Sequence, residues 1–334
     1  MLRFIVRRLL QLIPTLFGLS VLLFLWLHNL PGGPEAALLG DRATAERRAQ
    51  VREALGLNDP LWEQYGRFMQ QLIHLDFGSS IQSGRPVLDE FVERFPATIE
   101  LSFTAMAIAI AFGIPLGYLA ARRRGGFLDF GAVTSSLIGI CIPVFFLAYL
   151  LKELFAVNLG MFPASGRITI GLATPDVTGL IVFDSLITGD MQLFSDALAH
   201  LVLPGVALAS IPLAIIVRMT RASVLEVLGE DYVRTAESKG LRESTIRGRH
   251  VLRNAMLPVM TTIGLLTGSL LSGAVLTETV FAFPGIGSFL ATAIPARDYP
   301  LMMGFIMMIA TSYVLINLLV DISYSIIDPR VRVR

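Results

Sequence analysis

The sequence predicts an all-α polytopic membrane protein with six transmembrane helices. Hydrophobic residues make up 54% of its 334 residues and charged residues only 16%, whereas soluble domains contain about 25% charged residues. A hydrocarbon core of about 30 Å requires roughly 20 apolar residues in a helix. Uncharged windows of this length are found at 9–28, 101–121, 130–151, 197–217, 254–277 and 299–320.

The first window follows Arg3, Arg7 and Arg8 and at first sight resembles a secretory signal. Its apolar part is too long for a signal peptide, and no small-x-small cleavage pattern follows it. We therefore interpret it as a retained first span.

The distribution of basic residues predicts the orientation of the spans. With the N-terminus inside, 17 of the 27 lysine and arginine residues fall on inner segments, as expected when positive flanks stay in the cytoplasm. Both termini are therefore predicted to be cytoplasmic. The organisation that follows is an N-terminal segment with the first span (1–30), an extracytoplasmic segment (31–96) and a core (97–330), which contains an outer segment (158–196) and a cytoplasmic loop (221–256).

The extracytoplasmic segment is long enough to fold, although a simple connector is the alternative. We expect a helix that begins near Pro60 and is capped by Asn58 or Asp59. Apolar residues recur at helical spacing in this stretch; they are Leu61, Tyr65, Phe68, Met69 and Leu72.

Residues that could carry chemistry are few. The ionisable residues nearest the spans are at span edges, where side chains are normally solvated or reach toward the headgroups; they are Glu100, Lys152, Glu153, Glu278 and Asp321. The histidines lack metal-ligand spacing, and neither a G-x-S-x-G motif nor a phosphate-binding Gly-Lys-Ser/Thr loop is present. We predict no catalytic residue, metal or cofactor. The net charge of +1 gives no reason to expect a nucleic-acid partner.

Prolines in the middle of spans predict kinked or loosened helices, which suit a transport pathway. They are Pro115, Pro143, Pro204 and Pro212.

The polar stretch 230–258 predicts two short helices joined at a corner. Glu230 and Asp231 place negative charge at a helix start, and Gly240 supplies a left-handed stop. Ser244 is the expected cap of the second helix, and Pro258 the expected entry to the fifth span. The first helix would present Tyr232, Arg234 and Lys239 to a partner. The alternative is an amphipathic hairpin that rests on membrane lipid.

The stretches "RTAESKG" and "RHVLRNAMLP" resemble the cytoplasmic EAA loop of ABC importer permeases, in the variant form of the peptide and nickel permeases. Arg234 and Thr235 stand where the general consensus has Glu and Ala. The resemblance extends over nearly the whole chain, from "MLRFIVRRLLQLIPTLFG" to "TETVFAFPGIG" and "NLLVDISYSIIDPRVR". Within the family, the dipeptide-importer branch is most similar.

The resemblance implies a type I ABC importer permease fold with a cytoplasmic coupling helix. Such a permease pairs with a second homologous permease, sits on two ATP-binding subunits that hydrolyse ATP, and receives peptide from an extracytoplasmic binding protein or lipoprotein. From its length and its amphipathic run, we also expect the segment 31–95 to help cover the outer mouth, where substrate is delivered. The docking residues would be Glu230, Asp231, Tyr232, Arg234, Thr235, Ala236, Lys239, Gly240 and Leu241.

The implied function is import of dipeptides or short peptides across the cytoplasmic membrane. Oligopeptide, glutathione, nickel and haem remain alternative cargoes. An ion-coupled secondary transporter would need charges at mid-membrane, and a membrane enzyme would need catalytic groups within the spans.

Overall fold

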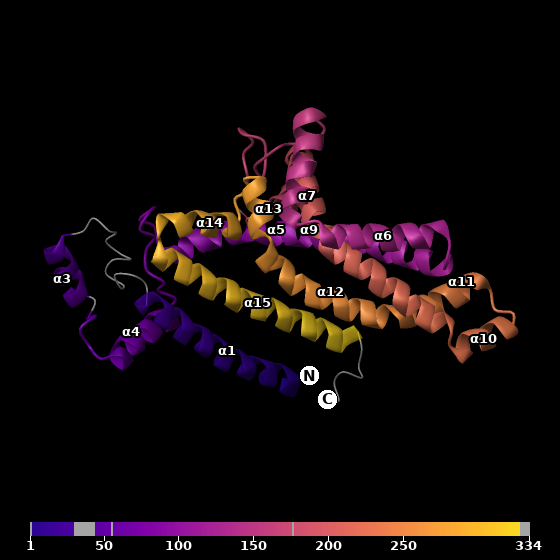
Figure 1. The fold of residues 1–334 in the computed structure, drawn as a ribbon, viewed down its shortest axis with the longest axis horizontal. Coiled ribbons are helices and arrows are strands. Elements are labelled where there is room, and N and C mark those ends of the chain that lie inside the picture. Colours follow the sequence, from indigo (N-terminus) through magenta and orange to yellow (C-terminus); the bar gives the residue numbers. More distant parts are fainter. Residues whose placement is uncertain (1, 30–43, 55, 176, 328–334) are drawn as a thin grey trace. The chain divides into compact units, whose positions relative to one another are not determined.

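The computed structural model describes residues 2–29, 44–54, 56–175 and 177–327, and all regular elements in this part are helices (Figure 1). The C-terminal basic residues, Arg330 to Arg334, lie outside it. The elements are α1 (Leu2–His28), α3 (Ala45–Ala54), α4 (Leu61–Ile73), α5 (Val87–Arg122), α6 (Phe127–Cys141), α7 (Val144–Leu151), the π-helix η1 (Lys152–Asn158), α8 (Ile181–Thr188), α9 (Met191–Leu228), α10 (Asp231–Ser238), α11 (Glu243–Thr245), the π-helix η2 (Ile246–Leu252), α12 (Arg253–Gly273), α13 (Val275–Val280), α14 (Ile286–Ala296) and α15 (Tyr299–Ile327).

The predicted all-α membrane architecture is confirmed. Within the described residues, four helices are long and apolar enough to cross a membrane: Leu9–His28, Val87–Arg122, Met191–Leu228 and Tyr299–Val320. The pair α6 and α7 with η1 adds a fifth if it is counted as one span. The window predicted at 254–277 is helical as α12 and α13, with α12 alone 21 residues long.

The window at 130–151 is not one continuous helix, and the kink predicted at Pro143 is confirmed. α6 and the following helix are bent by 103° at a break around Ile142 and Pro143. Proline has no backbone N–H and forces the preceding residue into extended conformation, and Ile142 has φ −79° and ψ 123°. Pro204 and Pro212, in contrast, lie inside α9, which remains one helix.

The chain divides into two compact units, which we describe separately. Unit 1 contains Met1–Pro96 and Gly285–Leu318, and unit 2 contains Ala97–Pro284 and Leu319–Arg334.

In unit 1, α4 packs against the end of α1. Phe24 lies edge-on to Tyr65 at 5.3 Å between ring centroids and contacts Phe68 at 5.8 Å. The predicted helix near Pro60 is therefore confirmed, and Leu61 is its first residue. The predicted cap is wrong: Pro60 is the cap residue and no side chain caps the helix, because the Asp59 carboxylate pairs with Arg67 instead, at 2.8 Å.

A second cluster of unit 1 joins the start of α5 to α14 and α15. Val87 and Phe91 are buried one helical turn apart, and Phe91 packs edge-on against Phe305. The loop before α5 is fixed by the buried Asp298, whose carboxylate accepts a hydrogen bond of 2.5 Å from Ser80.

In unit 2, α9 is the central helix, with α6, α7, α8 and α12 packed on it. α5 approaches it closely through Gly113 and Gly117, which are one turn apart. A Cβ on Gly117 would lie 2.5 Å from the carbonyl oxygen of Val217. Small residues at this spacing let two membrane helices approach backbone to backbone.

Candidate functional site

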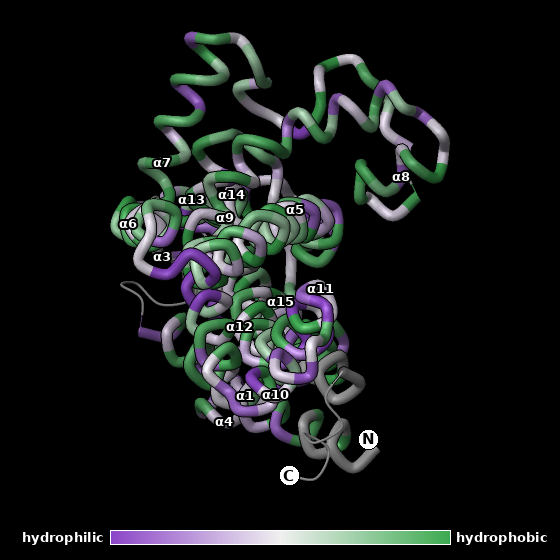
Figure 2. The backbone as a smooth tube through the Cα atoms, turned by 90° about the vertical axis from the view of Figure 1, so that its right-hand side faces the viewer, coloured by the Kyte–Doolittle hydropathy of each residue, from purple (hydrophilic) through white to green (hydrophobic). Residues whose placement is uncertain are grey.

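The polar connector between α9 and α12 lies at one end of unit 2, away from α7 and α13 (Figure 1). Hydrophilic residues gather on its helices α10 and α11, whereas α6 is mainly hydrophobic (Figure 2). α10 begins at Asp231, after the extended residue Glu230. The carboxylate of Asp231 stands in the first turn, where the helix dipole favours negative charge.

The corner after α10 has the left-handed conformation that the sequence predicts. Gly240 has φ +70°. Its N–H donates to the carbonyl of Glu237, and the N–H of Leu241 donates to the carbonyl of Ala236, at 2.9 and 3.3 Å. These two bonds define a Schellman motif. A Cβ at Gly240 would meet no atom within 4 Å, so glycine is favoured here by the backbone conformation alone.

The second arm differs from the prediction. The cap residue is Arg242 rather than Ser244, which lies inside α11. Pro258 does not mark the entry to a span either, because it lies inside α12. The chain stays helical from α11 through η2 into α12, so the corner at Gly240 connects α10 directly to a long helix.

One face of α10 is buried in a small apolar cluster. Val233 is 1% exposed and Ala236 is 4% exposed. They pack with Val224 of α9 and with Ile246 and Val251 of η2. Of the predicted docking residues, Ala236 therefore points inward.

The opposite face of α10 is exposed to solvent. The other predicted residues lie on it or beside the corner: Glu230, Asp231, Tyr232, Arg234, Thr235, Lys239, Gly240 and Leu241. The Tyr232 hydroxyl accepts a hydrogen bond of 3.0 Å from the Asn254 amide, which orients the ring. The structure thus presents these residues on a helix whose other face is fixed.

Ion pairs brace the surroundings of this loop. Arg122 donates to Glu243 at 3.1 Å, and Arg247 pairs with the same carboxylate. The carboxylate of the buried Asp129 accepts two hydrogen bonds from the Arg221 guanidinium of α9, of which the one from Nη2 is 2.8 Å long. It also accepts a hydrogen bond from the N–H of Gly125. Both ends of the short connector between α5 and α6 are therefore tied to the helices around α10.

The expectation that edge charges are solvated is wrong for two glutamates. Glu278 is 0% exposed and accepts a hydrogen bond of 2.6 Å from Thr98. Glu100 is 7% exposed and binds Arg167 at 2.6 Å and the N–H of Val182 at 2.6 Å. Buried carboxylates are stable only when paired in this way. The partners are distant in sequence, so spacing gave no signal of them.

Lys152 is half-buried and donates to the carbonyl of Val280 at 2.7 Å, whereas Glu153 is exposed as expected. The side chain of Asp321 lies outside the described residues.

The outer segment 158–196 is fixed by a further buried acid. The Asp184 carboxylate is 0% exposed and accepts hydrogen bonds from the Thr178 hydroxyl and the Gly179 N–H, at 2.6 and 3.0 Å. Burial opposes ionisation, but these hydrogen bonds outweigh it and hold the pKa of Asp184 below its ordinary value of 3.8.

Comparisons with known proteins agree with this architecture. A family model described as "Binding-protein-dependent transport system inner membrane component" matches residues 113–333, and its N-terminal companion matches residues 1–102. The chain is 47% identical to the dipeptide transport system permease protein DppB of Escherichia coli K12, over 99% of each chain. It is 44% identical to DppB of Alkalihalophilus pseudofirmus, over 99% of this chain and 100% of the relative.

A glutathione transport system permease protein, GsiC of Escherichia coli O1:K1, is 39% identical over 99% of each chain. The family match covers most of the chain, and the relatives match its full length. The chain is therefore a multi-pass membrane protein that belongs to the binding-protein-dependent inner membrane components, the permeases of ABC importers.

Proposed function

We propose that this chain is one permease subunit of an ATP-driven importer of dipeptides, and that α10 is the helix on which an ATPase subunit docks. The observation that carries the docking proposal is the two-sided structure of α10: Val233 and Ala236 are buried, and Tyr232 and Arg234 are exposed. Support for a dipeptide cargo comes from the full-length similarity to dipeptide permeases.

In this proposal, movement of the ATPase is transmitted through packing. A push on the exposed face of α10 is passed by Val233 to Val224 of α9 and Val251 of η2, which share its cluster. Both continue as long helices within unit 2. Closely packed interiors transmit displacement rather than absorb it, so the docked helix can move the spans. The proposed complex contains a second homologous permease, two ATP-binding subunits that hydrolyse ATP, and an extracytoplasmic peptide-binding protein or lipoprotein.

Charge reversal tests the docking face. Arg234→Glu should reduce co-purification of the ATPase subunits at least ten-fold and abolish uptake in a strain lacking its own dipeptide importer. Arg234 is exposed and its ion pair with Asp231 is long at 3.8 Å, so the amount of inserted permease should not change. Arg249→Glu, at an exposed arginine of η2, is the control and should retain the ATPase. Normal co-purification of the ATPase subunits with Arg234→Glu would refute docking through α10.

The cargo is tested separately, by measuring the uptake of a panel of di- to pentapeptides in the same strain.

We also propose that both termini are cytoplasmic, on the basis of the basic residues on inner segments. Ser83 and Ser244 are both exposed, so cysteines there can be reached by reagents. In a background lacking Cys141, Ser83→Cys should react with a membrane-impermeant maleimide in intact cells, and Ser244→Cys only after lysis. Labelling of Ser244→Cys in intact cells would overturn the orientation.

A further inference from the structure

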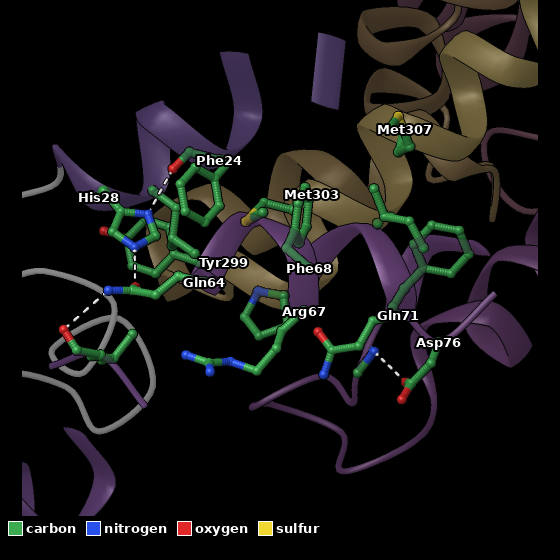
Figure 3. Close-up of a pocket in the computed structure, with 17 residues that line it drawn as sticks. Phe24, His28, Gln64, Arg67, Phe68, Gln71, Asp76, Tyr299, Met303 and Met307 are labelled. Atoms are coloured by element: carbon green, nitrogen blue, oxygen red, sulfur yellow. Dashed lines mark hydrogen bonds between the residues drawn. The ribbon is translucent and has the colours of Figure 1, made fainter. Parts of the chain in front are cut away.

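Unit 1 contains a cavity of about 420 Å³, whose lining includes no residue of the proposed docking loop (Figure 3). It lies between the last turns of α1, the helix α4, the loop that follows α4, and the first turns of α15. A volume of this size is in the range of ligand pockets.

The walls of the cavity are apolar. Seven side chains form them, and all are buried or half-buried; they are Phe24, Leu27, Phe68, Leu72, Phe77, Met303 and Met307. Phenylalanine and methionine side chains adapt readily to an irregular apolar ligand. Water gains few hydrogen bonds from such walls, so they favour a hydrocarbon occupant.

The polar groups of the cavity are gathered at its rim. His28 and Gln64 are already engaged: Nε2 of His28 contacts Oε1 of Gln64 at 2.8 Å, and the Gln64 amide donates to the carbonyls of Leu57 and Asp59. Arg67 and Asp76 are both exposed on the same side of the cavity (Figure 3). The Arg67 guanidinium pairs with Asp59 at 2.8 Å and donates to the carbonyl of Gly56 at 2.8 Å. The rim therefore offers the Asp76 carboxylate and a guanidinium that is shared with Asp59.

The depth of the cavity matches one leaflet of a bilayer. Tyr299, which lines the cavity, lies beside Trp26 of α1 with ring centroids 5.9 Å apart, and such aromatic residues mark the membrane–water interface. From Tyr299 the lining residues of α15 extend to Met307, which is about 12 Å along a helix. Half of the hydrocarbon core is about 15 Å.

The outer face of α4 agrees with this placement. Its Trp62 is 75% exposed and the last residue, Ile73, is 73% exposed. Large apolar side chains exposed at both ends of an amphipathic helix are typical of a helix that lies in the membrane interface. The cavity beneath α4 would then open toward lipid.

We propose that this cavity binds one zwitterionic glycerophospholipid with a primary ammonium group. An acyl chain fills the space between Phe24, Leu72 and Met303, the phosphate binds the Arg67 guanidinium, and the ammonium binds the Asp76 carboxylate. With Asp59 beside Arg67, this side of the cavity carries two carboxylates and one guanidinium, which disfavours an anionic headgroup relative to a zwitterionic one. A short peptide carries the same two charges, but the leaflet-deep apolar wall favours a lipid.

Native mass spectrometry of the purified importer complex tests the site. After exchange into detergent with dioleoyl phosphatidylethanolamine, phosphatidylcholine or phosphatidylglycerol, one molecule of the ethanolamine lipid should be retained per permease. Leu72→Trp, which fills the cavity, should weaken retention at least ten-fold. Ile73→Trp places the same side chain on the next, exposed residue outside the cavity and should retain the lipid.

Charge variants separate headgroup recognition from folding. Asp76→Asn keeps the oxygen that accepts the N–H of Gly78 at 3.0 Å, but it should lose the preference for the ethanolamine lipid over the choline lipid. Arg67→Lys should retain binding of the ethanolamine lipid, and Arg67→Gln should lose it. Equal retention by Leu72→Trp and wild type would overturn the site, as would preference for phosphatidylglycerol or displacement by dileucine. Each outcome is independent of transport, so a failed importer assay leaves the test intact.

Discussion

The two polar connectors that flank α9 treat their charged residues in opposite ways. The connector before α9 directs two of its charges inward: Asp184 is 0% exposed, and Arg167 pairs with the buried Glu100. The connector after α9 exposes them, and the side chains of Asp231 and Arg234 are 99% and 71% exposed. Charges directed inward fix a segment to its own core, whereas charges directed outward from a fixed helix remain available to a partner. The comparison indicates a structural role for the charges of the first connector and supports the proposal that the second connector is a docking surface.

The largest expected effect comes from breaking a buried pair. Arg167→Met leaves Glu100 buried without its cation, and we expect a loss of about 3–5 kcal/mol in stability. Thermal unfolding of the purified permease should show a large drop in Tm. Arg234→Met is the matched control in the exposed connector and should not change Tm.

The double variant Glu100→Gln/Arg167→Met should recover part of the loss, because no uncompensated charge remains. Equal Tm values for Arg167→Met and Arg234→Met would remove the distinction between the two connectors.

A smaller effect is expected at the corner of the exposed connector. Gly240→Val forces a β-branched residue into the left-handed region, which costs about 1–2 kcal/mol. This strain should leave the permease inserted but weaken ATPase pull-down and peptide-stimulated ATP hydrolysis together. Gly84→Val is the control, because Gly84 also has φ +70° and open surroundings but lies in unit 1. Wild-type coupling in Gly240→Val, or an equal defect in Gly84→Val, would contradict a specific role for the corner.

The smallest effect concerns the pH dependence of the buried connector. Because the pKa of Asp184 is lowered in the folded protein, its stabilisation is present above its ordinary value of 3.8 and is lost as pH falls through the lower folded value. Amide exchange at Thr178 and Gly179 should accelerate in that acidic range. In Asp184→Asn this acceleration should disappear; an unchanged profile would show that another group controls it.

Local patterns predicted much of the proposed docking loop. The negative charge of Glu230 and Asp231 indicated the start of a helix, and Gly240 indicated its left-handed end, because both signals depend on neighbours within one or two turns. The cap at Ser244 was wrong because Arg242 already has the extended conformation that starts the helix. Helix ends respond to the path of the whole chain as well as to residue type.

Burial of charge could not be predicted in the same way. Glu100 and Glu278 have the same sequence context as solvated residues at the ends of spans. Their partners Arg167 and Thr98 are 67 and 180 residues away in sequence. Only the packing of α5 against the outer segment and α13 brings these groups together.

The sequence by itself determined the apolar windows, the family and the glycine corner, because hydropathy, motif and backbone preference are properties of short segments. The kink at Pro143 was predicted as well, but the tertiary structure set its angle of 103°. It also decided that two edge glutamates are buried and that α1, α4 and α15 enclose a cavity with a charged rim. Each of these depends on which surfaces meet across the chain, and the free energy of such contacts is set by geometry that no single segment contains.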